Sequence, residues 1–534
     1  MGITYKNKWE LRTLLIAILI FINNGLYAKK IEWNVFDYGA KGDGIALDTK
    51  AIQKAIDLCH EAGGGVVRLA NGCFLSGSIF LKDNVELRIE TGAKLLGSLR
   101  SEDYRLIQDS ISLDNYNAGK ALIYGEGVSN ISITGNGTID GNGEYLTKKN
   151  EIRAHIIHLK SCDQVKVKDI TLKNGSWWIQ KYHLCNHLTI DGVRVDSKEN
   201  QNMLHPRYAD APGRNTDGCN IVDSKNVQIS NCNIFSGDDG IVLKSFSQTG
   251  SCHNVTITNC IISTNASGIK IGTETAGDFH DIVINNCVVY DTRLGGIELI
   301  SVDGAKLERI MVTNISMNNV QGAAIFIRLA NRARKYNNEL EPTVGQLKDV
   351  IISNIMGKNI GRYGCTLTGI PQRDIENIVL DNINLSFEGG ENSLYFEGYP
   401  DKPVKELTVD NVPECEKDYP RCDIFGKLPA YGFYIRHAKG IELNNIKLSF
   451  DKKEIRPAII ADDVERLTVK QLYAQGTPQT NSLLHFRNVR RGIVNNSSCF
   501  GNVPVFLHLS GMETDNVQCR NNFIEKPTKE IVNK

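Results

Sequence analysis

The chain has 534 residues, of which 41% are hydrophobic and 23% charged, so it can bury a large core and is not globally disordered. Lysine plus arginine equals aspartate plus glutamate at 61 each, which excludes the strong basic footprint of a nucleic-acid or anionic-membrane binder. An anionic substrate must therefore be met by a local basic cleft.

The N-terminus, residues 1–28, is predicted to be an export signal. Basic residues up to Arg12 precede an apolar run from Leu14 to Ile22, and Ala28 suits the last position before cleavage. Nine apolar residues are too few to cross about 30 Å of hydrocarbon. We expect export to the periplasm or the extracellular space, and no membrane span in the mature protein.

A helix from Asp48 to about Glu61 is predicted next, with Asp48 as its N-cap. Its apolar positions share one face: Ala51, Ile52, Ala55, Ile56 and Cys59. Such a helix suits the cap that a repeat protein needs over its open end.

One sequence motif then recurs through most of the chain. In it, apolar and polar residues alternate with a period of two on either side of an asparagine or aspartate. Examples are Asn226–Ser236 (NVQISNCNIFS), Asn254–Ser263 (NVTITNCIIS), Asp281–Tyr290 (DIVINNCVVY), Asn377–Phe387 (NIVLDNINLSF) and Gly440–Phe450 (GIELNNIKLSF). The alternation indicates short strands with one buried face, and asparagine suits the turns because it tolerates the left-handed region. Repetition at roughly 23 to 40 residues indicates a solenoid. We predict an all-β, right-handed parallel β-helix forming one catalytic domain over 29–534.

The fourteen cysteines follow the repeat rather than a disulfide framework. Cys232, Cys260 and Cys287 recur at one point of the motif, which favours a buried stack of small side chains. Cys415 and Cys422 lie in an irregular segment and are the better candidates for a disulfide.

The region 214–301 carries the candidate site. Gly240-Ile-Val-Leu, Gly268-Ile-Lys-Ile and Gly296-Ile-Glu-Leu recur at intervals of 28 residues. Because strand side chains alternate, the isoleucines and leucines must point inward, while Val242, Lys270 and Glu298 form one exposed column. Lys244, Gly272 and Ile300 are predicted to form the next column.

Three aspartates fall in the same frame. Asn215-Thr-Asp-Gly, one coil earlier, places Asp217 beneath Asp239, and Asp238 directly precedes Asp239. A turn or bulge between Gly237 and Gly240 would direct both adjacent carboxylates toward one cleft. Glycoside hydrolysis needs one protonated and one ionised carboxyl group, and crowding like charges raises one pKa. An Asp-Gly turn, a calcium site or a solvated edge are the plainer interpretations.

Asn215-Thr-Asp-Gly followed by Gly237-Asp-Asp-Gly resembles glycoside hydrolase family 28, the polygalacturonase-like enzymes. Phe36-Asp-Tyr-Gly-Ala-Lys-Gly-Asp-Gly and Leu75-Ser-Gly-Ser-Ile-Phe-Leu-Lys resemble the family's entry coil, and the Trp177-Trp178 segment is similar too. The resemblance implies a hydrolase of pectic polysaccharides or oligosaccharides that inverts the anomeric centre. By resemblance, Asp238 is the general acid, and Asp217 and Asp239 hold and activate the water.

The chain departs from the family at its substrate-binding cations. Ser267-Gly268 stands where the family carries a histidine between two glycines, and Glu298-Leu-Ile where it carries Arg-Ile-Lys. The loss of these cations puts plain homogalacturonan in doubt as the substrate. It favours a resemblance to the rhamnogalacturonan-active or exo-acting branches of the family. Lys270, Lys244 and Arg293 are candidates for replacement charge.

Two more residues are assigned to substrate binding. Glu298 is expected to pair with Lys270, to contact substrate, or both, and Asn215 is also expected to contact substrate. Long coils at 199–214 and 331–348 suit a cleft closed at one end and hence exo action.

Two alternatives from other classes stay open. A pectate-lyase-type enzyme would use the aspartates for calcium and Lys244 or Lys270 as base. A non-catalytic carbohydrate-binding solenoid is the other, although it has no need of clustered carboxylates. We expect a monomer with no cofactor and no structural metal.

Overall fold

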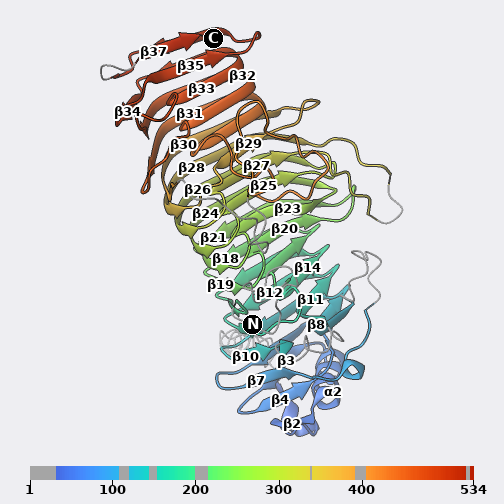
Figure 1. The fold of residues 1–534 in the computed structure, drawn as a ribbon. Helices are drawn as coiled ribbons and strands as arrows, with labels where there is room; N and C mark the ends of the chain where they lie inside the picture. The colour runs from blue at the N-terminus through green and yellow to red at the C-terminus, as the bar shows by residue number, and fades with distance from the viewer. Residues whose placement is uncertain are drawn as a thin grey trace, which may run out of the picture.

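The computed structural model describes residues 32–107, 119–143, 153–198, 215–336, 340–390, 404–524 and 529–533. The predicted signal segment and the long coil 199–214 lie outside these residues. Figure 1 shows coils stacked into one elongated solenoid, from helix α2 (Thr49–Glu61) at one end to strand β37 (Lys529–Asn533) at the other. Successive coils pair in parallel, so the predicted parallel β-helix is confirmed.

The strands form three stacks, each contributing one side of the solenoid. The first stack begins with β1 (Glu32–Asn34), β3 (Gly65–Leu69), β6 (Val85–Ile89), β9 (Ser129–Thr134), β12 (Asp163–Lys168), β15 (Asn186–Asp191), β18 (Lys225–Ser230) and β21 (Ser251–Thr258). The second contains β2 (Asp43–Leu47), β4 (Cys73–Ser76), β7 (Lys94–Gly97), β10 (Thr138–Asp140), β13 (Thr171–Lys173), β16 (Arg194–Asp196), β19 (Asn233–Ser236), β22 (Ile261–Thr264) and β34 (Ser498–Phe500). The third contains β5 (Ile79–Phe80), β8 (Lys120–Glu126), β11 (Ala154–Lys160), β14 (Gln180–His183), β17 (Cys219–Val222), β20 (Ile241–Ser245), β23 (Ile269–Thr275), β25 (Ile297–Ser301), β27 (Ile325–Leu329), β29 (Cys365–Thr368), β35 (Val505–Ser510) and β37.

Longer strands turn the corners between stacks in the C-terminal half. The first and second stacks share β24 (Asp278–Thr292), β26 (Lys306–Val320), β28 (Gln346–Ile360) and β30 (Ile375–Phe387). The third stack also includes the first residues of β31 (Phe433–Phe450), β32 (Ile459–Gln475) and β33 (Leu484–Asn495), and β36 (Asp515–Arg520) pairs with the end of β33. Two short 3-10 helices are η1 (Val35–Tyr38) and η2 (Ser101–Asp103).

Asparagine turns the chain near the start of first-stack strands, at Asn226 and Asn254, and between the first and second stacks, at Asn231 and Asn259, as the repeat predicts. Asn226 and Asn254 both have φ of 55°, in the left-handed region that asparagine tolerates better than most residues. Their side chains also form a ladder, because Asn254 Nδ2 donates to Asn226 Oδ1 at 2.9 Å one coil below. The repeated asparagine therefore serves both the turn and the stacking of coils.

The core fills the inside of the solenoid with aligned columns. Ile241, Ile269 and Ile297 pair in register and are at most 1% exposed. The cysteines of the repeat are buried in the same core, as predicted. All fourteen cysteines lie in the described residues and are free thiols, so the disulfide expected between Cys415 and Cys422 is wrong. The Cys422 side chain instead packs among apolar residues on the outside of the third stack.

Helix α2 caps the N-terminal end as predicted, burying Ile52, Ala55, Ile56 and Cys59 against the first coils. Asp48 occupies the N-cap position but makes no side-chain capping bond. Its carboxylate instead accepts from the backbone N–H groups of Lys41 at 2.7 Å and Gly42 at 2.9 Å. Asp48 therefore secures the preceding turn rather than the helix itself.

A segment without regular strands, residues 404–432, covers the outside of the third stack, and we call it the overlying segment. Its apolar side chains, including Leu407 and Phe425, pack on outward-facing Phe326 and Tyr434 of the coils. Arginines of the coils fix it: Arg436 donates to the Val412 carbonyl at 2.9 Å, and Arg328 donates to the Glu414 carbonyl. The outward face of this stack is therefore buried over several coils.

Candidate active site

Strands β20, β23 and β25 place the predicted column on the outside of the third stack. Val242 pairs with Lys270, and Lys270 pairs with Glu298, so this register is confirmed. The neighbouring column, predicted to contain Lys244, Gly272 and Ile300, does not keep its register. The pairing shifts after Leu243, because Ser245 pairs with Thr275. β23 has two more residues than β20 between these pairs, and they form a bulge opposite Lys244 that removes Gly272 from the predicted pairing with it.

The column is not exposed, which corrects the sequence-based expectation. Val242 and Glu298 have no exposed surface, and Lys270 is 3% exposed. Alternation fixes only which side of a strand a residue faces, whereas exposure depends on what lies over that side. The overlying segment covers the outward face from β25 onward, where Leu294, Ile300 and Cys422 share one apolar cluster.

The three aspartates lie at the turns that precede β17 and β20. The Gly218 N–H donates to the Asp239 carbonyl at 2.9 Å, which stacks Asp217 beneath Asp239 as predicted. A Cβ at Gly240 would lie 2.4 Å from the Gly268 carbonyl oxygen, so the coils approach too closely for any side chain there. The glycines of both motifs therefore allow the aspartates to gather on adjacent coils.

The Asp238 carboxylate is held by two backbone donors. Asn215 N–H donates to Oδ2 and Asp239 N–H to Oδ1, each at 2.9 Å. The Ser236 hydroxyl donates to the Asp238 carbonyl at 2.7 Å, which fixes the bend between the two strands. The bend turns both Asp238 and Asp239 toward the site, as the predicted turn or bulge requires.

Burial and mutual repulsion raise the pKa of two of these carboxyl groups. The pKa of Asp217 lies well above its ordinary value, first because the group is buried and second because Asp238 is close. The pKa of Asp238 is raised by burial and by Asp239, against the opposing effect of its two backbone donors. The Asp239 carboxylate accepts hydrogen bonds from Lys270 Nζ at 3.0 Å and from the Ser267 N–H at 3.1 Å.

Each lysine of the site already has carboxylate partners. Lys270 Nζ also lies 3.6 Å from Glu298 Oε2, and Lys244 Nζ donates to Glu274 Oε2 at 2.8 Å. Burial lowers the pKa of both lysines, but Asp239 acting on Lys270 and Glu274 acting on Lys244 outweigh it, so both pKa values are raised. Both side chains are therefore charged and compensated within the protein.

The other predicted binding residues have different surroundings. Asn215 Oδ1 accepts from an Arg153 guanidinium N–H at 2.7 Å, and the same guanidinium lies 3.7 Å from the centre of the Trp177 ring. Arg293 donates its Nε–H to the Asn265 carbonyl at 2.8 Å, in the turn one coil below. Asn215 is thus joined to the aspartates, because its backbone N–H donates to Asp238. Arg293 is instead directed to the backbone by its bond to the Asn265 carbonyl.

Three participants were missed in the sequence. Glu274 lies beyond the bulge that interrupts the repeat, and Tyr419 comes from the overlying segment, where its hydroxyl accepts from Thr273 Oγ1 at 2.9 Å. Arg332, from the long coil after β27, donates Nε–H to buried Asp303 at 3.0 Å and lies 5.8 Å from the Tyr419 ring centre. None has a periodic signal, although the length of the coil at 331–348 points to an elaboration there.

Neither a metal centre nor a membrane span is found in the described ranges. No group of three or more histidine, cysteine, aspartate or glutamate side chains among these residues is arranged to hold a metal ion. Across the same residues, no helix is both long and apolar enough to cross a membrane.

Comparison with known proteins gives the chain's relationships. The model of the glycosyl hydrolases family 28 matches residues 72–412. A probable polygalacturonase of Vitis vinifera is 24% identical, over 66% of this chain and 74% of its own. An endo-polygalacturonase of Pectobacterium parmentieri is 28% identical, over 68% and 83% respectively. The solved family 28 exopolygalacturonase of Yersinia enterocolitica shares the fold with a TM-score of 0.57 at 18% identity, covering 84% of this chain and 79% of its own. With a family match over more than half its length, the chain belongs to the glycosyl hydrolases family 28 and is a glycosidase.

Proposed function

We propose that this glycosidase hydrolyses α-linked, galacturonate-containing bonds of pectin with inversion at the anomeric centre. Asp238 is the general acid, and Asp217 and Asp239 hold and activate the water. The supporting observation is that the pKa values of two clustered carboxyl groups, Asp217 and Asp238, are raised, and the choice of Asp238 rather than Asp217 as the acid follows the family resemblance. Burial and Asp239 raise the pKa of Asp238, which favours its protonated form, while Asp239 faces the Lys270 ammonium and the Ser267 N–H.

In the proposed reaction, the Asp238 proton passes to the glycosidic oxygen as its bond to the anomeric carbon breaks. Asp239 takes a proton from a water that Asp217 also holds, and the water oxygen bonds to the anomeric carbon from the opposite face. Asp238 ends as a carboxylate and Asp239 as an acid, so one proton exchange with solvent restores the site. The Lys270 ammonium lies 3.0 Å from Asp239 Oδ2 and fixes the orientation of this carboxylate.

The lyase alternative requires a basic group that is neutral before the reaction. Lys244 and Lys270 are the candidate bases, but their carboxylate partners raise the pKa of each. A lysine held in its charged form is a poor proton acceptor. The electrostatics of the two lysines therefore support hydrolysis over elimination.

The test compares the wild type with Asp238→Asn on homogalacturonan, rhamnogalacturonan and their oligosaccharides. Reducing ends report cleavage, and ultraviolet absorbance reports unsaturated sugars. We expect saturated products and a loss in kcat of about 10²- to 10⁴-fold in the variant. Asp196→Asn, a half-exposed carboxylate of β16, is the matched control and should keep full activity. Unsaturated products, or full turnover by Asp238→Asn, would contradict the proposal.

The sugar bound over Asp239 and Lys270 is proposed to be neutral, which favours rhamnogalacturonan over homogalacturonan. Both lysines are already compensated, and a second uronate carboxylate there would add negative charge near Glu298, which is fully buried. We expect kcat/KM at least tenfold higher on rhamnogalacturonan oligosaccharides. Equal or better use of oligogalacturonates of the same length would overturn this assignment while leaving the hydrolytic roles intact.

Exo action is proposed from the wall on the C-terminal side of the aspartates. The overlying segment buries the outward face from β25 onward and brings Tyr419 to Thr273. Arg332 and Asp303 fix the long coil beside it. A closed end leaves room for a chain terminus but not for a continuing polymer. A time course on a long substrate should release short products of constant size, and random internal cleavage would contradict the proposal.

A further inference from the structure

A cavity of about 600 Å³ lies on the third stack far from the aspartates. This volume falls within the range of about 300–1,000 Å³ found for small-molecule sites. Its floor is formed by Ile460, His485, His508 and Val532, which are successive members of the column that carries Lys270 and Glu298. His485 lies six coil steps beyond Lys270, about 29 Å at about 4.8 Å per step.

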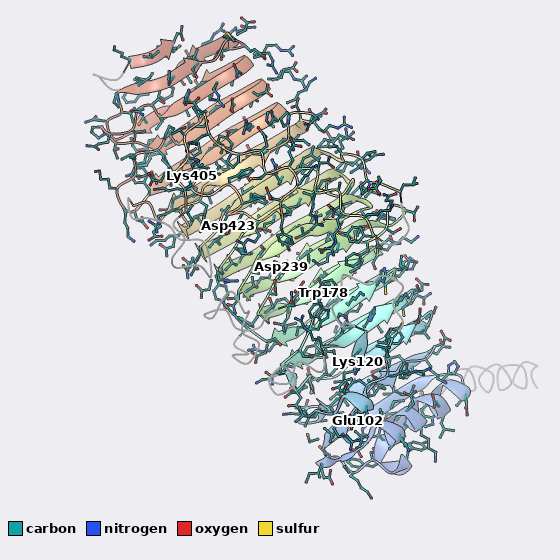
Figure 2. All side chains as sticks on the ribbon, turned by 45° about the vertical axis from the view of Figure 1, so that its right-hand side comes forward. Glu102, Lys120, Trp178, Asp239, Lys405 and Asp423 are labelled. Carbon is teal, nitrogen blue, oxygen red and sulfur yellow. The ribbon has the colours of Figure 1, made fainter. Side chains whose placement is uncertain are left out.

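The cavity and the catalytic carboxylates lie on the same side of the solenoid but are separated. Figure 2 shows Trp178, Asp239, Asp423 and Lys405 in this order along its axis. Asp423 belongs to the part of the overlying segment that covers the coils between them, and Lys405 adjoins the cavity wall at Glu406. The cavity is therefore a separate site and not an extension of the cleft.

The walls of the cavity are held in place without a ligand. Residues 406–409 and 427–429 of the overlying segment form one side, and the turns before β32 and β33 form the other. Arg487 joins the two sides, because it donates to Asp410 at 2.7 Å and to Asp462 on the coil at 2.7 Å. Arg456 donates to the Leu428 carbonyl at 2.9 Å. A preformed cavity lowers the entropic cost of binding.

The charges around the cavity cancel. Lys427 Nζ lies 3.1 Å from Glu406 Oε1, and Arg456 pairs with Glu454 at 2.7 Å. Burial and the neighbouring His508 lower the pKa of His485 to about 4, so that ring is neutral near pH 7. A ligand with a net charge would find the lining charges Lys427, Glu406 and Arg456 already paired and would itself lack a counter-charge, so the cavity suits a neutral ligand.

The lining combines a flat surface with polar groups. The imidazole rings of His485 and His508 are stacked, with centres 4.4 Å apart and planes inclined by 19°. Leu407 and Pro429 add apolar surface, and Thr408, Asn481 and Ser482 bring hydroxyl and amide groups to the wall. A pyranose ring has matching features, an apolar C–H face and a rim of hydroxyl groups.

We propose that this cavity is an ancillary binding site for a neutral saccharide, such as a neutral side chain or terminal stretch of a polysaccharide. Holding such a stretch on the same side as the aspartates raises the effective concentration of the polymer at the cleft. The site should then lower KM for a branched polymer and leave kcat on a short substrate unchanged. Binding here does not depend on which bond the aspartates cleave.

The test is calorimetric titration with β-1,4-galactotriose, α-1,5-arabinotriose and trigalacturonate. Thr408→Trp adds a bulky ring at the wall, where the threonine side chain is exposed and the coil core is untouched. His508→Ala removes half of the stacked floor. The matched control is His280→Ala, because His253 and His280 form a similar stacked pair, 4.8 Å apart, outside the cavity. Circular dichroism and Tm show whether each variant is folded.

We expect at least one neutral trisaccharide to bind the wild type, and both cavity variants to weaken that binding at least tenfold while His280→Ala does not. Absence of neutral-saccharide binding, or equal binding by Thr408→Trp, would overturn the proposal, and Thr408→Trp decides if His508→Ala fails to fold. Tighter binding of trigalacturonate would overturn the assignment of a neutral ligand. The titrations stand apart from turnover, so failure of the hydrolytic proposal at Asp238 would be seen separately.

Discussion

Lys270 joins the clustered carboxylates to the next coil through Asp239. Its Nζ donates to Asp239 Oδ2 at 3.0 Å, and Asp239 belongs to the turn before β20, whereas Lys270 is the second residue of β23. Only 3% of Lys270 is exposed, so the ammonium has exchanged water for protein partners. The stacking of two coils, rather than a flexible loop, therefore sets the orientation of the Asp239 carboxylate.

Replacing this lysine should affect stability and activity together. Lys270→Met would leave the Asp239 and Glu298 carboxylates buried without their cation, and breaking a buried pair typically costs about 3–5 kcal/mol. We expect a lower Tm in thermal unfolding and a loss of kcat of at least about tenfold.

Lys168→Met is the control for this substitution. Lys168 lies 3.2 Å from Asp191 on the same solenoid, but it is 46% exposed, so the expected change in unfolding free energy is about 0–1 kcal/mol. If Lys270→Met unfolded like the control and kept its kcat, Lys270 would have no part in positioning Asp239.

The repeat made the fold and the register predictable, but not the burial of the site. The glycine frame placed Lys270 under Glu298 correctly, because equivalent residues of successive coils must pair. It failed at Lys244, where the bulge in β23 adds residues that no periodic pattern contains. Tyr419 and the thiol of Cys422 belong to the overlying segment, whose position depends on tertiary packing alone. The residues that cover the column therefore lie in irregular segments, which no periodic pattern predicts.

The raised pKa of Asp217 predicts how stability depends on pH. A carboxyl group whose pKa is higher in the folded chain binds its proton more tightly there, so its contribution to stability falls as pH rises from 3.8, its ordinary value, to the raised one. Asp217→Asn removes this contribution. We expect its Tm to fall less than that of the wild type from about pH 4 to about pH 8. Parallel Tm curves for the two proteins would contradict the raised pKa.

Glu274 should have the opposite effect. Burial opposes its ionisation, but Lys244 and Arg332 lower its pKa from 4.5 to about 2, so its contribution to stability is present above 4.5 and is lost as pH falls toward about 2. Glu274→Gln should lower Tm at neutral pH, because Lys244 is left buried without its partner, and the gap to the wild type should narrow in acid. A gap that stays constant with pH would show that the substitution acts through packing.

Tyr419 should affect substrate binding without supporting the fold. It is 54% exposed, and its hydroxyl accepts a hydrogen bond from Thr273 Oγ1 at 2.9 Å. An aromatic face beside the closed end suits stacking on a terminal sugar, so Tyr419→Ala should raise KM for short substrates about threefold to tenfold, with Tm and kcat little changed. Tyr473→Ala, 43% exposed on β32 and stacked on Phe500, is the control. An unchanged KM in Tyr419→Ala would show that the terminal sugar binds elsewhere, and a fall in kcat alone would make the tyrosine part of the chemical step.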